Sequence, residues 1–426
     1  MDVNDTALLD AVELLKLFAT GDLTPLQALK GVTERIARRN PEVNAFAAMN
    51  PSSLAAARES TQRWQAGQAR ALEGIPVTVS DLVDVAGLPT RRGSKTSGSA
   101  PVRRDAPLVA VLRAAGAVII GKTNVAEFGW KYQGDSPLSG ITRNPWNSQY
   151  NAGGPSGGAA AAAAGFFGPL HIADGDVSVP AAWCGVVGLK LGTRAENQGI
   201  IARSVADVAL LSNVLRGNTG SAQQEAVKQG LKIGILHHPG FAASASASSW
   251  AAVDKAKEML AAQGALCSEV AVELPEIETV FTALWRERIG RDLKTLSADQ
   301  YALLDPALAS LATGFAAESV IDQQILATIS ADAERLIAGL DVDVLICPAV
   351  PHEAPFADIQ TLDPLSALRQ DWAPWTMLFT LTGQAVLTLP VGVEADGLPV
   401  AVQIAAKTGD SELVLRVARA LEQALV

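Results

Sequence analysis

The chain has 426 residues, of which 49% are hydrophobic and only 18% are Asp, Glu, Lys or Arg, and its formal net charge at pH 7 is -10. This composition excludes extensive disorder and coiled coil, because an average soluble domain carries about 25% charged residues. The negative balance argues against nucleic acid and anionic membranes as partners, since clustered Lys and Arg side chains hold both.

Apolar residues at helical spacing predict a helical hairpin over residues 7–20 and 25–39, and a third helix over 52–67. Helices and strands then alternate. The predicted strands cover 74–79, 118–120, 233–236, 342–346, 386–389 and 400–404, and the predicted helices cover 109–115, 205–215, 253–263 and 411–425. This alternation predicts an α/β fold, in which helices cover both faces of a large, twisted, mixed sheet.

No linker rich in Gly, Ser or Pro divides the chain, so we predict one domain over 1–426. It would combine an N-terminal helical part (1–70) with an α/β core (71–426). The low-complexity segment 240–249 is typical of a surface loop.

The stretch 152–173 contains no Asp, Glu, Lys or Arg, and about 20 apolar residues are enough to span a bilayer. Glycines and prolines interrupt it, however, and only Ala159–Ala164 is an uninterrupted helix former. We therefore predict a small-residue helix that packs at close range against neighbouring backbone, and no membrane association.

Cysteine and histidine spacing indicates neither disulfides nor a metal site. The residues are Cys184, Cys267 and Cys347, without a Cys-x-x-Cys pair, and His171, His237, His238 and His352, without a pair at i, i+4. The N-terminus lacks the basic and apolar regions of a signal peptide. These observations predict a cytoplasmic protein with no metal and no cofactor.

Several segments, in order, resemble the amidase signature family, and the similarity spans about the whole chain. The segments are Gly74–Asp81, Val85–Thr90, Ala114–Asn124, Arg143–Asn147, Gly153–Gly158 and Pro180–Lys190. The resemblance implies the amidase-signature fold and activity on carboxamides. It also implies a serine nucleophile, a bridging serine on a cis peptide and a lysine base, since a hydroxyl attacks an amide only after a base takes its proton.

Three positions depart from the family pattern. Ser80 stands where the family has its lysine, Pro155 where it has the bridging serine, and Asp176, four residues before Pro180, where it has the nucleophile. The arginine that the family often has two places later corresponds to Ser178, so a carboxylate ligand would lose a partner. We therefore interpret the chain as a catalytically degenerate family member.

Pro155 also suggests that the backbone shape is kept. A cis bond costs about 3 kcal/mol before an ordinary residue and only about 0.5–1 kcal/mol before proline. We therefore predict that the Gly154–Pro155 peptide is cis.

The individual residues leave alternatives open. Asp176 is either a new acid, base or nucleophile, or a hydrogen-bonded loop residue, and Ser156 is a nucleophile candidate to which no Lys or His is linked by a motif. Lys122 lies in a segment that looks structural in the family. The candidate ligand-binding residues are Ser156, Asp174, Gly175 and Trp130, with core packing as the alternative for Trp130.

Three functions compete. The first is a degenerate homologue that serves as a structural or regulatory subunit or binds a small amide or carboxylate. The second is a carboxamide hydrolase with a rebuilt site at Asp176, Asp174 or Ser156. The third is the scaffold half of a heteromer with an active amidase relative, so the expected assembly is a homo-oligomer or such a heteromer.

Overall fold

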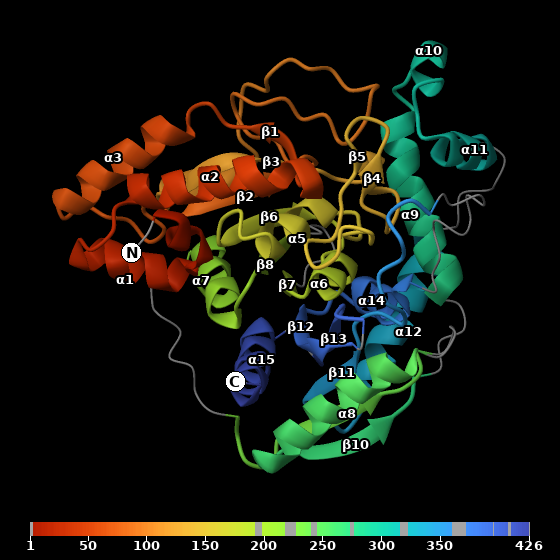
Figure 1. Cartoon of the computed structure of the whole chain (residues 1–426). Coiled ribbons are helices and arrows are strands. Elements are labelled where there is room, and N and C mark those ends of the chain that lie inside the picture. Colours follow the sequence, from red (N-terminus) through yellow and green to blue (C-terminus); the bar gives the residue numbers. More distant parts are fainter. Residues whose placement is uncertain are drawn as a thin grey trace.

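The computed structural model describes residues 3–191, 198–217, 227–239, 245–272, 277–315, 323–359, 372–394, 396–407 and 410–425. Within them, one mixed sheet has the strand order β1-β3-β2-β6-β8-β7-β12-β13-β11-β9-β10 (Figure 1). Its strands are β1 (Phe46–Met49), β2 (Pro76–Ser80), β3 (Val118–Thr123), β6 (Leu170–Asp174), β7 (Val187–Lys190), β8 (Gln198–Ala202), β9 (Lys232–Leu236), β10 (Leu266–Val270), β11 (Val344–Pro348), β12 (Val386–Val393) and β13 (Pro399–Ala406). A small ladder joins β4 (Asp135–Ser136) to β5 (Gly140–Ile141).

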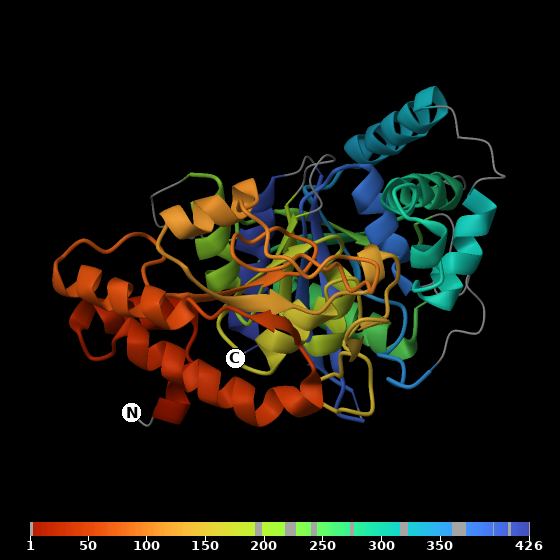
Figure 2. The same cartoon turned by 90° about the horizontal axis from the view of Figure 1, so that it is seen from above.

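Helices surround this sheet in both views (Figures 1 and 2). The α-helices of the first half are α1 (Ala11–Thr20), α2 (Pro25–Val43), α3 (Ser53–Gln65), α4 (Pro107–Ala114), α5 (Gly157–Ala164), α6 (Ser178–Cys184) and α7 (Val205–Leu215). Those of the second half are α8 (Ala247–Ala262), α9 (Ile277–Leu293), α10 (Ala298–Tyr301), α11 (Pro306–Phe315), α12 (Gln323–Gly339), α14 (Pro374–Leu381) and α15 (Ser411–Ala424). Short 3-10 helices are η1 (Val3–Leu8) and η2 (Glu127–Gly129).

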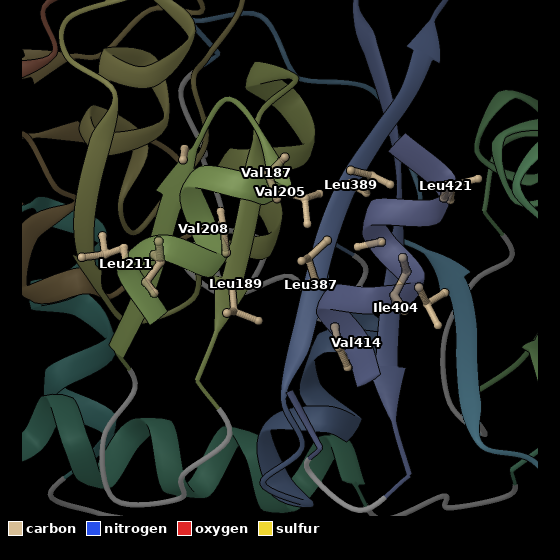
Figure 3. Close-up of a cluster of buried hydrophobic side chains, with 14 of the residues drawn as sticks. Val187, Leu189, Val205, Val208, Leu211, Leu387, Leu389, Ile404, Val414 and Leu421 are labelled. Atoms are coloured by element: carbon tan, nitrogen blue, oxygen red, sulfur yellow. The ribbon is translucent and has the colours of Figure 1, made fainter. Parts of the chain in front are cut away.

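The strands place apolar side chains on both faces of the sheet, because successive residues of a strand point in opposite directions. On one face, strand residues pack against α1, α7, α8 and α15 in a large buried cluster. Figure 3 shows its centre, where α7 and α15 lie over β7, β12 and β13; the residues labelled there include Val187, Leu189, Val208, Leu387, Ile404 and Val414.

The opposite face is covered by α5 and α6 at one end and by α14 at the other. Strand residues that alternate with those of the first face point to this one. Ala173 and Ile201 pack with α5 and α6, and Leu345, Val386 and Ala405 pack with α14. The predicted α/β class, with helices on both faces of a large mixed sheet, is therefore confirmed.

Most predicted elements occur within a few residues of their expected bounds, and helix 205–215 matches α7. One prediction is partly wrong. The expected loop 240–249 and helix 253–263 are corrected by α8, which begins at Ala247, because Ser246 Oγ accepts the Ser249 N–H (3.2 Å) as an N-terminal cap. Residues 240–244 lie outside the described part of the chain.

The alanine-rich stretch forms α5, which is short and buried. Ala159–Ala163 have no exposed surface, and the eight-residue helix is about 12 Å long, less than half of a bilayer core. The predicted small-residue helix is therefore confirmed. Among the described residues, no helix combines the length and the apolar character needed to cross a membrane.

His171 of β6 is a buried, neutral histidine. Its Nε2 lies 3.0 Å from Gly168 O and its Nδ1 lies 2.5 Å from Thr78 Oγ1, so Nε2–H donates to the carbonyl and Nδ1 accepts from the hydroxyl. Burial, aided by the positive charge of Arg203, lowers the pKa of His171 to about 3.

We expect this histidine to make the fold less stable in acid. Its pKa in the unfolded chain is about 6.5, so its stabilising contribution is full above pH 6.5 and decreases as the pH falls toward 3. Between these limits it adds a slope of about 1.4 kcal/mol per pH unit. Urea unfolding at several pH values should give H171Q a slope of unfolding free energy against pH that is smaller than the wild-type slope by this amount. Identical slopes for both proteins would contradict the expectation.

Candidate functional site

Three predicted site segments meet where β2 and β6 end. These strands are parallel neighbours, with Val79 beside Ile172, so their carboxyl ends lie at one edge of the sheet, where ligands bind in many α/β folds. β2 ends at Ser80 and β6 at Asp174, and Ser156 at the start of α5 donates from its Oγ to Asp174 O (3.0 Å). We call this place the centre.

Pro155 fills the middle of the centre. The Gly154–Pro155 peptide is cis, which confirms the prediction from the sequence. Pro155 O accepts the Ala126 N–H (3.1 Å), and an idealised Cβ on Gly175 would lie 2.9 Å from Pro155 Cγ. The proline ring therefore packs directly on the backbone of Gly175 and offers neither a hydroxyl nor an N–H.

Ser80 is fully buried, and its Oγ accepts a long hydrogen bond from the Leu82 N–H (3.4 Å). A serine hydroxyl does not accept a proton at neutral pH, so this side chain cannot serve as the base. It occupies the position with a small, uncharged group.

Lys122 of β3 lies on the other face of the sheet from Ser80. It is the register partner of Val79, the neighbour of Ser80, and adjacent strand residues point to opposite faces. Its Nζ contacts Asp81 Oδ1 (2.9 Å) and donates to Thr90 Oγ1 (2.7 Å) and Pro89 O (3.2 Å). Burial lowers the pKa of Lys122 while the Asp81 charge opposes this shift, so Lys122 forms a structural ion pair away from the centre.

Asp176 lies in the turn between β6 and α6. Its Oδ1 accepts the Ser178 N–H (2.8 Å), and its buried Oδ2 has no partner among the described residues. Burial raises the pKa of this carboxyl, against the hydrogen bonds from Ser178 and the charge of Lys190. A raised pKa increases the protonated fraction of this carboxyl at a given pH.

Lys190 received no role in the sequence analysis, although a lysine at the end of an apolar strand is a visible signal. It is 3% exposed, and its Nζ donates to Thr380 Oγ1 (3.0 Å) and Phe379 O (3.3 Å) of α14. Burial lowers the pKa of Lys190 to about 8, and the negative charge of Asp176 opposes this shift. Both hydrogen bonds hold its Nζ against α14, and a pKa near 8 lies close to the range that a general base needs at neutral pH.

Arg288 of α9 also escaped the sequence analysis, because it comes from a distant part of the chain. Burial raises the pKa of the Asp174 carboxyl, and the charges of Arg288 and Arg92 oppose this shift, which places both guanidinium groups within electrostatic range of the centre. The two charges partly compensate the buried carboxyl.

Trp130 is 1% exposed and belongs to a cluster with residues of α9 and α11. Its ring lies 6.3 Å from that of Trp285 and 5.3 Å from Lys131 Nζ, and its indole N–H has no acceptor in the described part of the chain. Trp130 therefore belongs to the packing around the centre and carries one unused donor.

The centre as described offers hydroxyl, carboxyl and guanidinium groups, and within the described residues no contact joins a lysine or histidine side chain to the Ser156 hydroxyl. Among the described residues, no three His, Cys, Asp or Glu side chains are grouped to hold a metal ion. Two described cavities lie elsewhere, one of about 650 Å³ beside Arg143 and Phe356, the other of about 340 Å³ beside Lys228 and Asp410.

Comparison with known proteins gives matches over most of the chain. The family model named Amidase matches residues 27–415. The AmiA2 protein of Mycobacterium tuberculosis, a putative amidase by name, is 31% identical over 459 residues, which cover 96% of this chain and 92% of the relative. One component of the glutamyl-tRNA(Gln) amidotransferase of Roseiflexus castenholzii is 29% identical, with 97% and 95% covered.

Solved structures agree with these matches. The 6-aminohexanoate cyclic dimer hydrolase superimposes with a TM-score of 0.87 and 26% identity over 100% of this chain and 98% of that one. A chain from a vestigial protein complex, described as revealing the evolutionary origins of an s-triazine catabolic enzyme, superimposes with a TM-score of 0.83 and 26% identity over 97% and 98%.

Proposed function

The chain belongs to the amidase signature family, and we propose that it is a member that has lost amide hydrolysis and uses the family fold to bind a small amide or carboxylate. One observation carries the proposal. Three linked positions, Ser80, Pro155 and Asp176, lack the base, the bridging hydroxyl and the hydroxyl nucleophile that the family chemistry needs. In well-studied serine hydrolases, removal of even one such residue lowers turnover by ~10⁴ to 10⁶.

The contacts of the centre support this proposal over a rebuilt hydrolase. Ser156 Oγ is engaged with a backbone oxygen, and the described residues supply it with no base. A carboxylate is a poor nucleophile toward an unactivated amide, so Asp176 does not replace a hydroxyl nucleophile. Binding therefore fits the side chains of the centre better than covalent catalysis does.

We propose that Ser156, Asp174, Gly175 and Trp130 border the ligand. The buried Asp176 Oδ2 supplies an acceptor, and the indole N–H of Trp130 supplies a donor. A primary amide presents both a donor and an acceptor and would satisfy such a pair, which favours an amide over a carboxylate.

We also propose that the chain works as one domain, since strands from its first and last thirds share one sheet, and that it assembles with itself or with an active relative. The support for a partner comes from relatives, which include one component of an amidotransferase and a chain from a protein complex. Recovery of the tagged protein from its own host, with mass identification of what co-purifies, would identify the partner.

A serine-directed fluorophosphonate tests the loss of hydrolysis. We expect less than about one-tenth of the purified protein to gain the mass of the probe under conditions that label an intact amidase of this family completely, because no base activates a serine here. Stoichiometric labelling, above all at Ser156, would overturn the proposal. A residual amidase rate that falls in the D176N variant would instead favour the rebuilt site.

A further inference from the structure

Residues 277–315, which form α9, α10 and α11, stand at one side of the molecule (Figure 1). We call them the cover. Their hydrophobic residues belong to two clusters. From Trp285 onward they pack with Phe128 and Trp130 of the loop after β3, whereas Val280 near the start of α9 is buried in the cluster beneath α14. The part from Trp285 onward is therefore a satellite cluster, which the first turns of α9 attach to the core.

Arg288 places the cover directly against the centre. Its Nη2 donates to Phe128 O (3.2 Å). An idealised Cβ on the next residue, Gly129, would lie 3.1 Å from Arg288 Nη2, 3.2 Å from Leu82 Cδ1 and 3.4 Å from Pro155 Cβ. The guanidinium, the proline and the loop after β2 therefore converge on one side of Gly129.

Charged and polar contacts fasten the cover on the side of the loop after β2. Arg92 Nη1 contacts Asp292 Oδ1 of α9 (2.6 Å), and Gln300 Nε2 of α10 donates to Thr96 O (3.2 Å). Both partners come from the segment that directly follows the end of β2.

Asp305, just before α11, fastens the cover to the loop after β3. Its N–H donates to the fully buried Glu127 Oε2 (2.7 Å), and its carboxylate accepts from Lys131 Nζ (2.9 Å). Lys131 has only 6% of its side chain exposed and also pairs with Asp135 (2.7 Å). A buried lysine between two carboxylates resists solvent screening, so this contact is the strongest charged link that we find between the cover and the core.

We infer that residues 277–315 act as a cover which closes the centre. The Asp305–Lys131 and Arg92–Asp292 ion pairs hold the cover in place, and Arg288 is the positioning residue that occupies the entrance. Ser156 has no exposed surface, whereas Asp174 and Asp176 beside it are partly exposed, so a ligand can reach the rim of the centre but reaches Ser156 only after a movement, which we assign to the cover. The inference rests on the proposed function, because it describes how the binding centre is opened. It is tested by access alone, without a ligand.

Thiol labelling measures this access. In a C267S background, where the remaining Cys184 and Cys347 are buried, the S156C variant places a thiol at the centre. We expect 5,5′-dithiobis(2-nitrobenzoate) to react with it at least tenfold faster when D305N or R288M is added. The control D341N breaks the exposed Lys232–Asp341 pair (2.7 Å) on a distant strand and should leave the rate within twofold.

Equal labelling rates in the cover variants and the control would overturn the inference. If a variant does not fold, hydrogen exchange of the unaltered protein decides: amides of residues 285–312 and 153–158 should exchange together and faster than those of α7 and α15. Exchange of all these segments at one common rate would reject a separately opening cover. Faster labelling without any binding of small amides would count against the proposed function and leave the cover intact.

Discussion

Replacement of Lys122 by methionine should lower the free energy of unfolding by about 3–5 kcal/mol. The Lys122 side chain has no exposed surface and that of Asp81 only 3%, and their 2.9 Å contact compensates two charges that have left water. Methionine matches the lysine in volume but leaves the Asp81 carboxylate buried without a charged partner. Urea denaturation followed by circular dichroism, with the wild-type slope retained, would measure the loss.

Removal of both charges distinguishes the contribution of the ion pair to stability from that of side-chain packing. The double variant D81N/K122M should recover most of the lost stability, because buried pairs replaced as a unit are often close to neutral. As a matched control, K232M breaks an exposed pair and should cost less than about 1 kcal/mol. A loss below about 1 kcal/mol for K122M itself would show that Asp81 is not held in its charged form.

This pair explains what remains of the ancestral site. The family motif carries its lysine immediately before the aspartate, and here the lysine position is Ser80 while Asp81 is kept. Asp81 neutralises Lys122 on the other face of the sheet, a structural task independent of catalysis. The ion pair therefore ties β3 to the end of β2 whether or not the site hydrolyses amides.

Much of the fold could be predicted from the sequence where the apolar pattern is regular. Helix α7 was expected over its whole length, because apolar residues recur at helical spacing, and in the structure Ser204 caps its first turn. Strand β6 was not predicted as an element, since five residues after Gly168-Pro169 form too short an apolar run to identify. Helices α9 to α12 were also missed, because their packing depends on distant contacts.

The candidate site was predicted in part for the same reason. Counting from Pro180 identified Asp176, and the glycine-rich motif identified Pro155 and its cis bond. Arg288 had no motif, and its position beside Gly129 follows only from how α9 docks on the loop after β3. Spacing along the chain predicts residues within a motif, but not which distant helix covers it.

Substitution of Gly158 by alanine should destabilise the fold by about 3 kcal/mol or more, at the upper end of the range for overpacking. An idealised Cβ on Gly158 would lie 2.4 Å from both the N and the O of Asn124 and 2.6 Å from Ala45 O. These are backbone atoms, which cannot rotate away as a side chain can. Chemical denaturation of G158A would measure the effect.

Gly290 of α9 supplies the matched control, since a Cβ there would meet no atom within 4 Å among the described residues. G290A should stabilise the protein by about 0.5–1 kcal/mol through helix propensity alone. A loss of unfolding free energy below about 1 kcal/mol for G158A would mean that α5 can move away from Asn124. Gly158 lies two residues after Ser156, and its N–H donates to Asn124 O (3.1 Å), so such a movement would displace the centre. Close packing at Gly158 therefore fixes both the fold and the geometry of the proposed binding site.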